Sequence, residues 1–330
     1  MSENKINAIV VEEFGGADKF QYKEIKEPVP EANQVRVKLE AVGVNPNEAY
    51  VLTGTYNLYV PELPFIPGFD GAGVIDEIGE NVTGFKEGDR VYIGSFRKTA
   101  QSGTYAEKMV VDSDIVYPLP DNASFEAGAA LGIPAYTAYH ALFQRAHIKA
   151  SETVLIHGAT GGVGSLAVQM AKAVGAKVIG TSSNEEGRQN IINIGADYAM
   201  GHLSEDNLTE LEKATDGKGP DVIIEFLANE NLETDLNAVA KGGRIAIIGA
   251  RDSVEISPRI IFSKDITLVG VAFTNLTEAD FAEAEAGINA FLTSDALKPV
   301  IGEKVPLKDA EKVHETLLTK SGDGKTILVP

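Results

Sequence analysis

A glycine-rich turn at residues 158–164, with the sequence GATGGVG, has the composition of a phosphate-binding loop. Ala159, Gly161 and Gly164 occupy the three glycine positions of the G-x-G-x-x-G dinucleotide fingerprint. An apolar run at 154–156 precedes the turn, and apolar residues at helical spacing follow it. Between a strand and a helix, such a turn lets the backbone approach a pyrophosphate, to which the helix offers N–H groups and partial positive charge. The stretch therefore predicts a dinucleotide site, with a tight turn that binds no ligand as the alternative.

The end of the next strand, at 177–181, indicates which dinucleotide is bound. NAD sites place an Asp or Glu about 20 residues after the glycine turn, where the carboxylate holds the ribose hydroxyls. Here Ser182 and Ser183 follow the strand, and Arg188 lies nearby. Small hydroxyl residues and an arginine suit the 2′-phosphate of NADP, so we predict NADPH as the cofactor. Arg188 is equally consistent with a surface position on a helix that begins after Asn184.

Length and charge restrict the class of protein. The chain has 330 residues, enough for two domains with separate cores. Its formal charge of −19 argues against nucleic-acid binding, which needs basic patches. The sequence shows neither an apolar run near the roughly 20 residues of a membrane span nor a signal-peptide core, so we expect a cytoplasmic protein.

Metal ligands are scarce in the sequence. The chain has no cysteine, which removes disulfides and cysteine-bound metal sites. The five histidines are scattered, with no pair at metal-ligand spacing: His140, His147, His157, His202 and His314. His157 ends a predicted strand and is typical of a packed or backbone-bonded histidine. Without cysteine or a cluster of histidine and carboxylates, the sequence predicts no metal.

The pattern of predicted secondary structure changes near residue 123. Before it, short strand-like runs alternate with glycine and proline breaks. After it, strands alternate with intervals that suit crossover helices, which predicts a doubly wound parallel sheet of Rossmann type. The expected strands of that sheet are 153–157, 177–181, 197–200, 221–225, 244–249 and 266–271.

The segment from residue 272 onward is too small to fold alone. It holds an expected helix at 278–292 and a closing strand at 325–329. We therefore expect an α/β protein with two domains. The Rossmann-type NADP-binding domain is expected at 123–271, and a β-rich domain is expected to combine 1–122 with 272–330.

Stretches spread over nearly the whole chain resemble a known family: 43–56, 132–142, 157–164, 180–187, 225–232, 242–251 and 297–302. With the two-domain pattern, they are similar to the medium-chain dehydrogenase/reductase superfamily, whose β-rich catalytic domain is GroES-like. In its zinc-dependent alcohol dehydrogenases a Gly-His-Glu motif supplies a zinc ligand, and here Phe69 and Asp70 replace the His-Glu pair after Gly68. This replacement resembles the zinc-free quinone oxidoreductase branch, and within it the zeta-crystallin-like group.

The resemblance implies a set of cofactor contacts. They are Thr160, Gly161, Gly162 and Val163 at the pyrophosphate; Ser183 and His202 around the adenosine ribose and its phosphate; Asn231 at the middle of the cofactor; Ile248, Gly249, Ala250 and Arg251 on the nicotinamide side of the sheet; Val271, Ala272 and Phe273 at the nicotinamide amide; and Tyr50 over the nicotinamide. Some bacterial quinone oxidoreductases carry a lysine for the 2′-phosphate where this chain has Gly187.

The resemblance also implies a reaction, the reduction by NADPH of a quinone bound in a cleft between the domains. Asn45, Tyr50 and Tyr56 are the polar residues expected to reach the acceptor. A tyrosine could donate a hydrogen bond or a proton to the developing oxyanion. Tyr56 could instead pack as a turn residue against neighbouring prolines.

Two other functions stay open. An NADPH-dependent reductase of enones or enoyl thioesters would use the same cofactor, and Arg97 and Lys98 weakly suggest a site for coenzyme A phosphates. A structural or RNA-binding role, which the zeta-crystallin-like group includes, conflicts with the charge of −19. The resemblance also implies a homodimer, because in this family the sixth strand often pairs two subunits. The strand at 266–273 is apolar enough for this, although a buried central strand would look the same.

Overall fold

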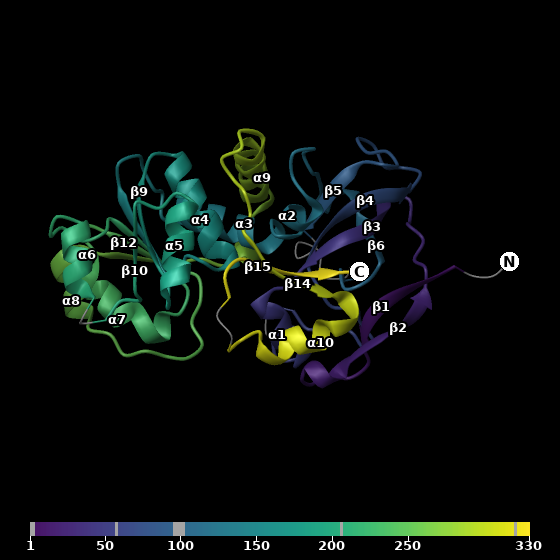
Figure 1. The fold of residues 1–330 in the computed structure, drawn as a ribbon, viewed down its shortest axis with the longest axis horizontal. Coiled ribbons are helices and arrows are strands. Elements are labelled where there is room, and N and C mark those ends of the chain that lie inside the picture. The colour runs from purple at the N-terminus through teal and green to yellow at the C-terminus, as the bar shows by residue number, and fades with distance from the viewer. Residues whose placement is uncertain (1–3, 57–58, 95–102, 205–206, 320–321) are drawn as a thin grey trace. The chain divides into compact units, whose positions relative to one another are not determined.

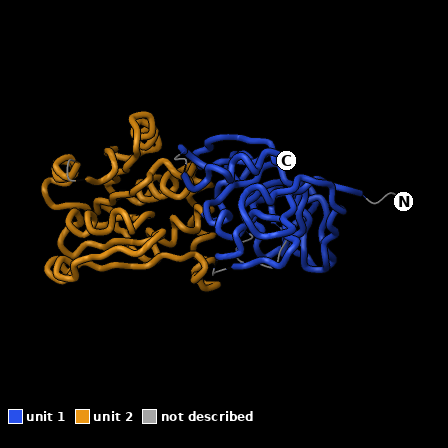
Figure 2. The backbone as a smooth tube through the Cα atoms, turned by 90° about the horizontal axis from the view of Figure 1, so that it is seen from below, with its two compact units in different colours: residues 1–133, 299–330 blue, residues 134–298 orange. Residues whose placement is uncertain are grey.

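The computed structural model describes residues 4–56, 59–94, 103–204, 207–319 and 322–330. The chain forms two compact units, coloured separately in Figure 2. The first unit contains residues 1–133 and 299–330, and the second contains residues 134–298. Among the described residues, no helix combines the length and the apolarity that crossing a bilayer requires.

The second unit is built on a six-stranded sheet with the order β10-β9-β8-β11-β12-β13 (Figure 1). Every pairing in this sheet is parallel. Its strands are β8 Thr153–Ile156, β9 Lys177–Thr181, β10 Tyr198–Met200, β11 Val222–Glu225, β12 Arg244–Ile247 and β13 Thr267–Gly270. This is the strand order of a doubly wound dinucleotide-binding fold, so the predicted fold class and all six expected strands are confirmed.

Helices follow the strands of this sheet, as parallel connections require. They are α4 Gly162–Ala173, α5 Glu185–Asn193, α6 Leu208–Ala214, α7 Ala228–Ala238, α8 Pro258–Lys264 and α9 Glu278–Thr293, with α3 Gly132–Tyr139 and a π-helical turn His140–Arg145 ahead of the sheet. Side chains cap the starts of α5 and α9. For example, the side chain of Asn184 accepts from the backbone N–H of Gly187 at the start of α5.

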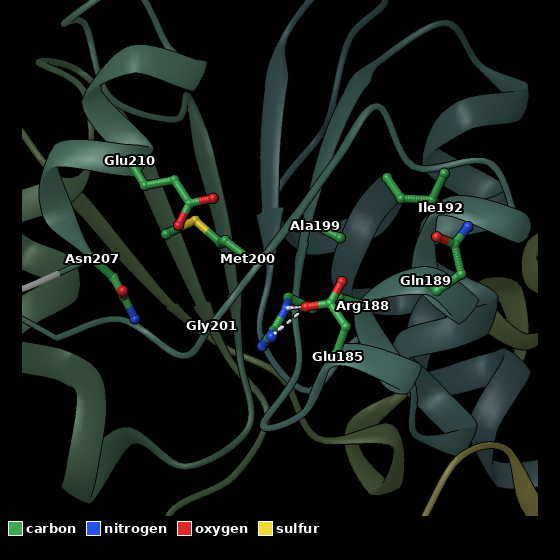
Figure 3. A pocket seen from close by; sticks show the side chains of 9 residues that line it. All are labelled: Glu185, Arg188, Gln189, Ile192, Ala199, Met200, Gly201, Asn207 and Glu210. Carbon is green, nitrogen blue, oxygen red and sulfur yellow. Dashed lines mark hydrogen bonds and ion pairs between the residues drawn. The ribbon is translucent and has the colours of Figure 1, made fainter.

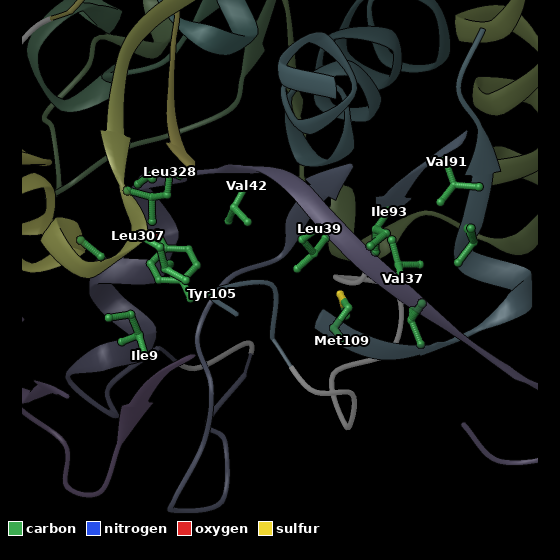
Figure 4. Packing of buried hydrophobic residues seen from close by; sticks show 14 of the residues in the cluster. Ile9, Val37, Leu39, Val42, Val91, Ile93, Tyr105, Met109, Leu307 and Leu328 are labelled. Carbon is green, nitrogen blue, oxygen red and sulfur yellow. The ribbon is translucent and has the colours of Figure 1, made fainter. Parts of the chain in front are cut away.

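The first unit is β-rich, with a seven-stranded sheet of order β14-β15-β3-β4-β5-β7, in which β6 also pairs with β3, and a hairpin of β1 and β2. Its strands are β1 Lys5–Val11, β2 Phe20–Lys26, β3 Gln34–Gly43, β4 Asp70–Ile78, β5 Arg90–Gly94, β6 Lys108–Asp112, β7 Val116–Pro118, β14 Ile301–Pro306 and β15 Lys325–Val329. Its short helices are α1 Pro46–Leu52, α2 Phe125–Ala129 and α10 Ala310–Thr316. Alternate strand residues such as Val37, Leu39 and Ile93 point into one apolar core with Tyr105 (Figure 4).

The compact units differ from the expected domain boundaries at both ends. α9 was expected in the β-rich domain but belongs to the second unit. There Phe291 stacks on Phe143, with 6.0 Å between ring centroids, and Phe281 packs on Tyr136 at 5.7 Å. At the other end, residues 123–133 belong to the first unit, where the backbone N–H of Ile133 donates to Asp70 at 2.9 Å.

Candidate functional site

The glycine turn connects β8 to α4 with the geometry of a phosphate-binding loop. α4 starts after Gly161, and no side chain caps its N-terminus. A Cβ on Gly164 would lie 2.4 Å from the carbonyl oxygen of Gly158, so this glycine allows the helix to pack against the turn. Gly158 has φ of +50°, and a Cβ there would meet open space. An accessible backbone beside uncapped helical N–H groups fits a pyrophosphate.

Thr181, the last residue of β9, joins the glycine turn to His202. Its hydroxyl accepts from the N–H of Gly158 at 3.2 Å and lies 3.1 Å from Nδ1 of His202. Its carbonyl accepts from the N–H of Ala159 at 3.0 Å. Burial lowers the pKa of His202, so the imidazole is neutral near pH 7. The structure thus brings His202 beside the turn at the carboxyl edge of the sheet.

Arg188 lines a surface pocket of about 550 Å³ formed by α5, the end of β10 and the start of α6 (Figure 3). Its guanidinium donates to Glu185 through Nε at 3.0 Å and Nη2 at 2.6 Å. Ser183 is exposed between β9 and α5. A Cβ on Gly187 would lie 2.1 Å from Oγ of Ser182, so a lysine at this position requires Ser182 to shift. The pocket is lined by Glu185, Arg188, Gln189, Ile192, Ala199, Met200, Gly201, Asn207 and Glu210.

The loop after β12 is tied to the start of α7, where Asn231 lies. The N–H of Ala228 donates to the carbonyl of Gly249 at 2.9 Å. The N–H of Arg251 donates to the side chain of Asn229 at 2.8 Å. These bonds bring the expected contacts at 248–251 next to the helix that carries Asn231. The residues Val271, Ala272 and Phe273 follow β13, and Val271 continues its ladder by donating to the carbonyl of Ile247 at 2.8 Å.

A buried cluster that the sequence did not predict lies at the carboxyl ends of β8 and β11 in the six-stranded sheet. Nε2 of His157 is 2.8 Å from Oδ1 of Asp235 and 3.4 Å from Oε2 of Glu225. Burial raises the pKa of Glu225 to about 7. Burial disfavours a charged His157, but the hydrogen bond and charge of Asp235 outweigh it and raise the pKa of the imidazole. The expectation that the chain lacks a cluster of histidine and carboxylates is therefore wrong, since ligand atoms of these three residues lie within 4.8 Å of one another.

In the first unit, the side chain of Asn45 is buried and hydrogen-bonded to other residues of that unit. It begins α1, and its Nδ2 donates to Asp70 at 2.8 Å. Its Oδ1 accepts from the ammonium of Lys325 at 2.5 Å, and that ammonium also lies 3.1 Å from Asp70. Asn45, which is 2% exposed, therefore joins α1 to β4 and β15. Asp70, the residue in place of the zinc-ligand motif's glutamate, is paired with a lysine cation.

Next to Asn45 lies a second buried network. The hydroxyl of Tyr105 donates to Glu48 at 2.6 Å and lies 2.8 Å from Nε2 of His314. Burial raises the pKa of Glu48 to about 7, against the hydrogen bond from Tyr105. Burial lowers the pKa of His314 to about 4. No local motif marks these residues, which come from α1, the segment before β6, and α10.

Tyr50 and Tyr56 lie close together in the first unit. Their rings stack with centroids 6.4 Å apart and an interplanar angle of 22°. Tyr50 is 37% exposed and Tyr56 is partly buried. Burial raises the pKa of Tyr56, so its phenol stays protonated and able to donate. Residues 57–58 and 95–102, which include Arg97 and Lys98, lie outside the described residues.

Comparisons with known proteins agree with this architecture. Residues 31–121 match the alcohol dehydrogenase GroES-like domain family, and residues 162–289 match the zinc-binding dehydrogenase family. The chain is 42% identical to a quinone oxidoreductase of Lama guanicoe, over 98% of this chain and 97% of the relative. It is 41% identical to a human quinone oxidoreductase, over 98% of each chain.

A solved structure is similar over the same length. The Escherichia coli quinone oxidoreductase complexed with NADPH has a TM-score of 0.85 and 29% identity, covering 98% of this chain and all of that one. The relatives and the two matched domains agree with the resemblance that the sequence carries. The chain belongs to the quinone oxidoreductase branch of the medium-chain dehydrogenase/reductase superfamily.

Proposed function

We propose that the protein is an NADPH-dependent quinone oxidoreductase that works without zinc. The observation that carries the proposal is the open glycine turn at the uncapped start of α4, in a chain of the quinone oxidoreductase branch. The chain is an oxidoreductase with a nicotinamide-dinucleotide site. NADPH, when bound, would supply the reducing equivalents, and the residues of this chain would hold it and orient the acceptor.

The preference for NADPH over NADH rests on the end of β9. No carboxylate side chain ends this strand, and Ser183 is exposed where the 2′-phosphate would lie. Arg188 is close by but is paired with Glu185. We propose that a 2′-phosphate draws the guanidinium away from Glu185, whose side chain is 83% exposed and loses little by the exchange. His202, held by Thr181, would flank the adenosine ribose.

For the acceptor, we propose that Tyr56 donates a hydrogen bond to the quinone oxygen as it gains negative charge. Its phenol stays protonated because burial raises its pKa. Tyr50, stacked on Tyr56, would cover the nicotinamide. A quinone is already electrophilic, so it needs less assistance than an unactivated ketone. Asn45 would act through its contacts with Asp70 and Lys325, which hold the start of α1.

The first experiment follows NADPH absorbance with purified protein and 9,10-phenanthrenequinone, with NADH in a parallel reaction. Rapid oxidation of NADPH and slow oxidation of NADH supports both the reaction and the cofactor preference. Equal rates refute the preference and keep the reaction. Binding of NADPH without quinone turnover refutes the reaction and favours an enone or enoyl thioester, which are tested next.

We also propose a homodimer, joined along β13. This strand is at one end of the six-stranded sheet and pairs only with β12 among the described strands. Phe262, on the preceding helix α8, is 72% exposed. Light scattering is expected to give twice the chain mass, and Phe262→Lys is expected to shift it toward the monomer. A monomeric mass for the unchanged protein refutes this assembly. The cytoplasmic location stays a prediction from the sequence.

A further inference from the structure

Three ionisable side chains lie together inside the second unit, beside the expected cofactor contacts. His157 follows β8, Glu225 ends β11, and Asp235 lies on α7. β8 and β11 are neighbours with Ile156 beside Ile224, so the next residue of each strand lies at the same edge of the sheet. The side chain of His157 is 3% exposed, and both carboxylates are fully buried. We call these three residues the buried triad.

One hydrogen bond, between His157 and Asp235, joins two members of the triad. Two ionised carboxylates without a cation would repel each other and lose their hydration. His157 donates to Asp235 through Nε2, which satisfies one oxygen of that carboxylate. A metal-ligating histidine normally donates its second ring N–H to an acceptor. Among the described residues, Nδ1 of His157 has no such partner.

The other carboxylate oxygen of Glu225, Oε1, links the buried triad to Asn231, one of the expected cofactor contacts. Its Oε1 accepts from the backbone N–H of Leu227 and from Nδ2 of Asn231, the latter at 3.2 Å. The contact joins Nδ2 of Asn231 to Oε1, so Asn231 presents its amide nitrogen to Glu225. Asn231 and Asp235 are four residues apart on α7, which places them on one face of the helix.

We propose that His157, Glu225 and Asp235 are positioning residues that orient Asn231 toward the dinucleotide. His157, bound to Asp235, lies 3.4 Å from Oε2 of Glu225 and restricts this carboxylate, whose Oε1 accepts from the amide nitrogen of Asn231. The carbonyl oxygen of Asn231 is then the atom left for the ligand. A carbonyl oxygen recognises a hydroxyl or amide donor, such as a ribose hydroxyl of the cofactor. The inference rests on the proposed dinucleotide site and assigns its orientation to buried residues that touch no ligand.

A double-mutant cycle on NADPH binding tests the proposal, with the dissociation constant measured by cofactor fluorescence and no quinone present. Glu225→Met removes the acceptor and keeps much of the side-chain length. It is expected to weaken NADPH binding about tenfold, as the loss of one partner of a buried hydrogen bond does. In an Asn231→Ala background the same change is expected to alter affinity less than about twofold, because Glu225 acts through Asn231.

Glu225→Gln is the matched control, since its carbonyl oxygen still accepts from Leu227 and Asn231 while its amide can donate to Asp235. It is expected to bind NADPH within about twofold of the unchanged protein. Asp235→Leu gives a second cycle with Asn231→Ala if Glu225→Met fails to fold. Equal effects of Glu225→Met with and without Asn231 would overturn the proposal. Absent NADPH binding by the unchanged protein would instead refute the cofactor assignment on which it rests.

Discussion

The hydroxyl of Tyr105 lies 2.6 Å from Oε2 of Glu48, and both side chains are enclosed in the core of the first unit. Burial raises the pKa of Glu48 to about 7, above its ordinary 4.5. Between those values the folded protein holds a proton that the unfolded chain releases, so stability falls as pH rises. We expect Glu48→Gln to remove this loss, which is on the order of 2 kcal/mol for the wild type between pH 5 and 8.

Denaturant unfolding of both proteins at pH 5, 6.5 and 8 measures this difference. His314 acts in the opposite sense, because burial lowers its pKa to about 4 and stability falls as pH drops from 6.5 toward 4. Since His314 is present in both proteins, subtraction isolates Glu48. A wild-type stability that runs parallel to that of Glu48→Gln at all three pH values would show that Glu48 is ionised in the fold.

Two alanine substitutions in the glycine turn separate folding from phosphate binding. A Cβ on Gly164 would lie 2.4 Å from the backbone oxygen of Gly158, so Gly164→Ala is expected to lower stability by about 1–3 kcal/mol. A Cβ on Gly161 would lie 3.4 Å from that oxygen, so Gly161→Ala should fold normally. Gly161→Ala is nevertheless expected to weaken NADPH binding, because the methyl occupies space that the pyrophosphate needs. Thermal unfolding and cofactor fluorescence give the two readouts, and unchanged affinity in Gly161→Ala would place the phosphates elsewhere.

Arg188 is expected to set the preference between the two nicotinamide cofactors. Arg188→Gln removes the charge that would meet a 2′-phosphate, and should reduce NADPH affinity about tenfold while leaving NADH affinity unchanged. Glu185→Gln is the counterpart, since it frees the guanidinium from its partner and should strengthen NADPH binding slightly. Calorimetric titration with both cofactors measures these effects. Equal losses for NADPH and NADH in Arg188→Gln would contradict a 2′-phosphate role.

Tyr56→Phe is expected to lower kcat for phenanthrenequinone about tenfold with little change in NADPH affinity, because it removes a donor to the developing charge. Tyr59→Phe is the matched control. Tyr59 is also partly buried, and its ring packs edge-on against Phe69 with centroids 6.1 Å apart. Steady-state kinetics of the two variants should differ in kcat. If both keep full activity, the proton or hydrogen bond comes from another group.

The protein is expected to contain no stoichiometric zinc after purification, although one of its matched families is named for zinc binding. Asp70 has a lysine partner, and in the buried triad His157 is hydrogen-bonded to Asp235. Elemental analysis measures the zinc content before and after dialysis against EDTA. Zinc at one atom per chain, lost together with His157→Gln, would place a metal in the triad and reject its hydrogen-bonded interpretation.

The sequence alone determined the glycine turn, the strands of the parallel sheet and the family, because each depends on local spacing or on backbone space. The turn needs glycines next to one another in the chain, and a buried strand shows as an apolar run. The sequence also predicted α9 as a helix, but it did not predict the unit to which the helix belongs. A helix carrying Phe281 and Phe291 can cover any apolar face, and only packing against Tyr136 and Phe143 assigned it to the second unit.

The buried polar networks were decided by the tertiary structure. His157 meets Asp235 across 78 residues of chain, and Tyr105 meets His314 across 209. Each residue alone has the features of an ordinary strand or helix position, so no local pattern marks it. Their protonation follows from shared burial and from charges that arrive from other elements, which exist only after the chain has folded.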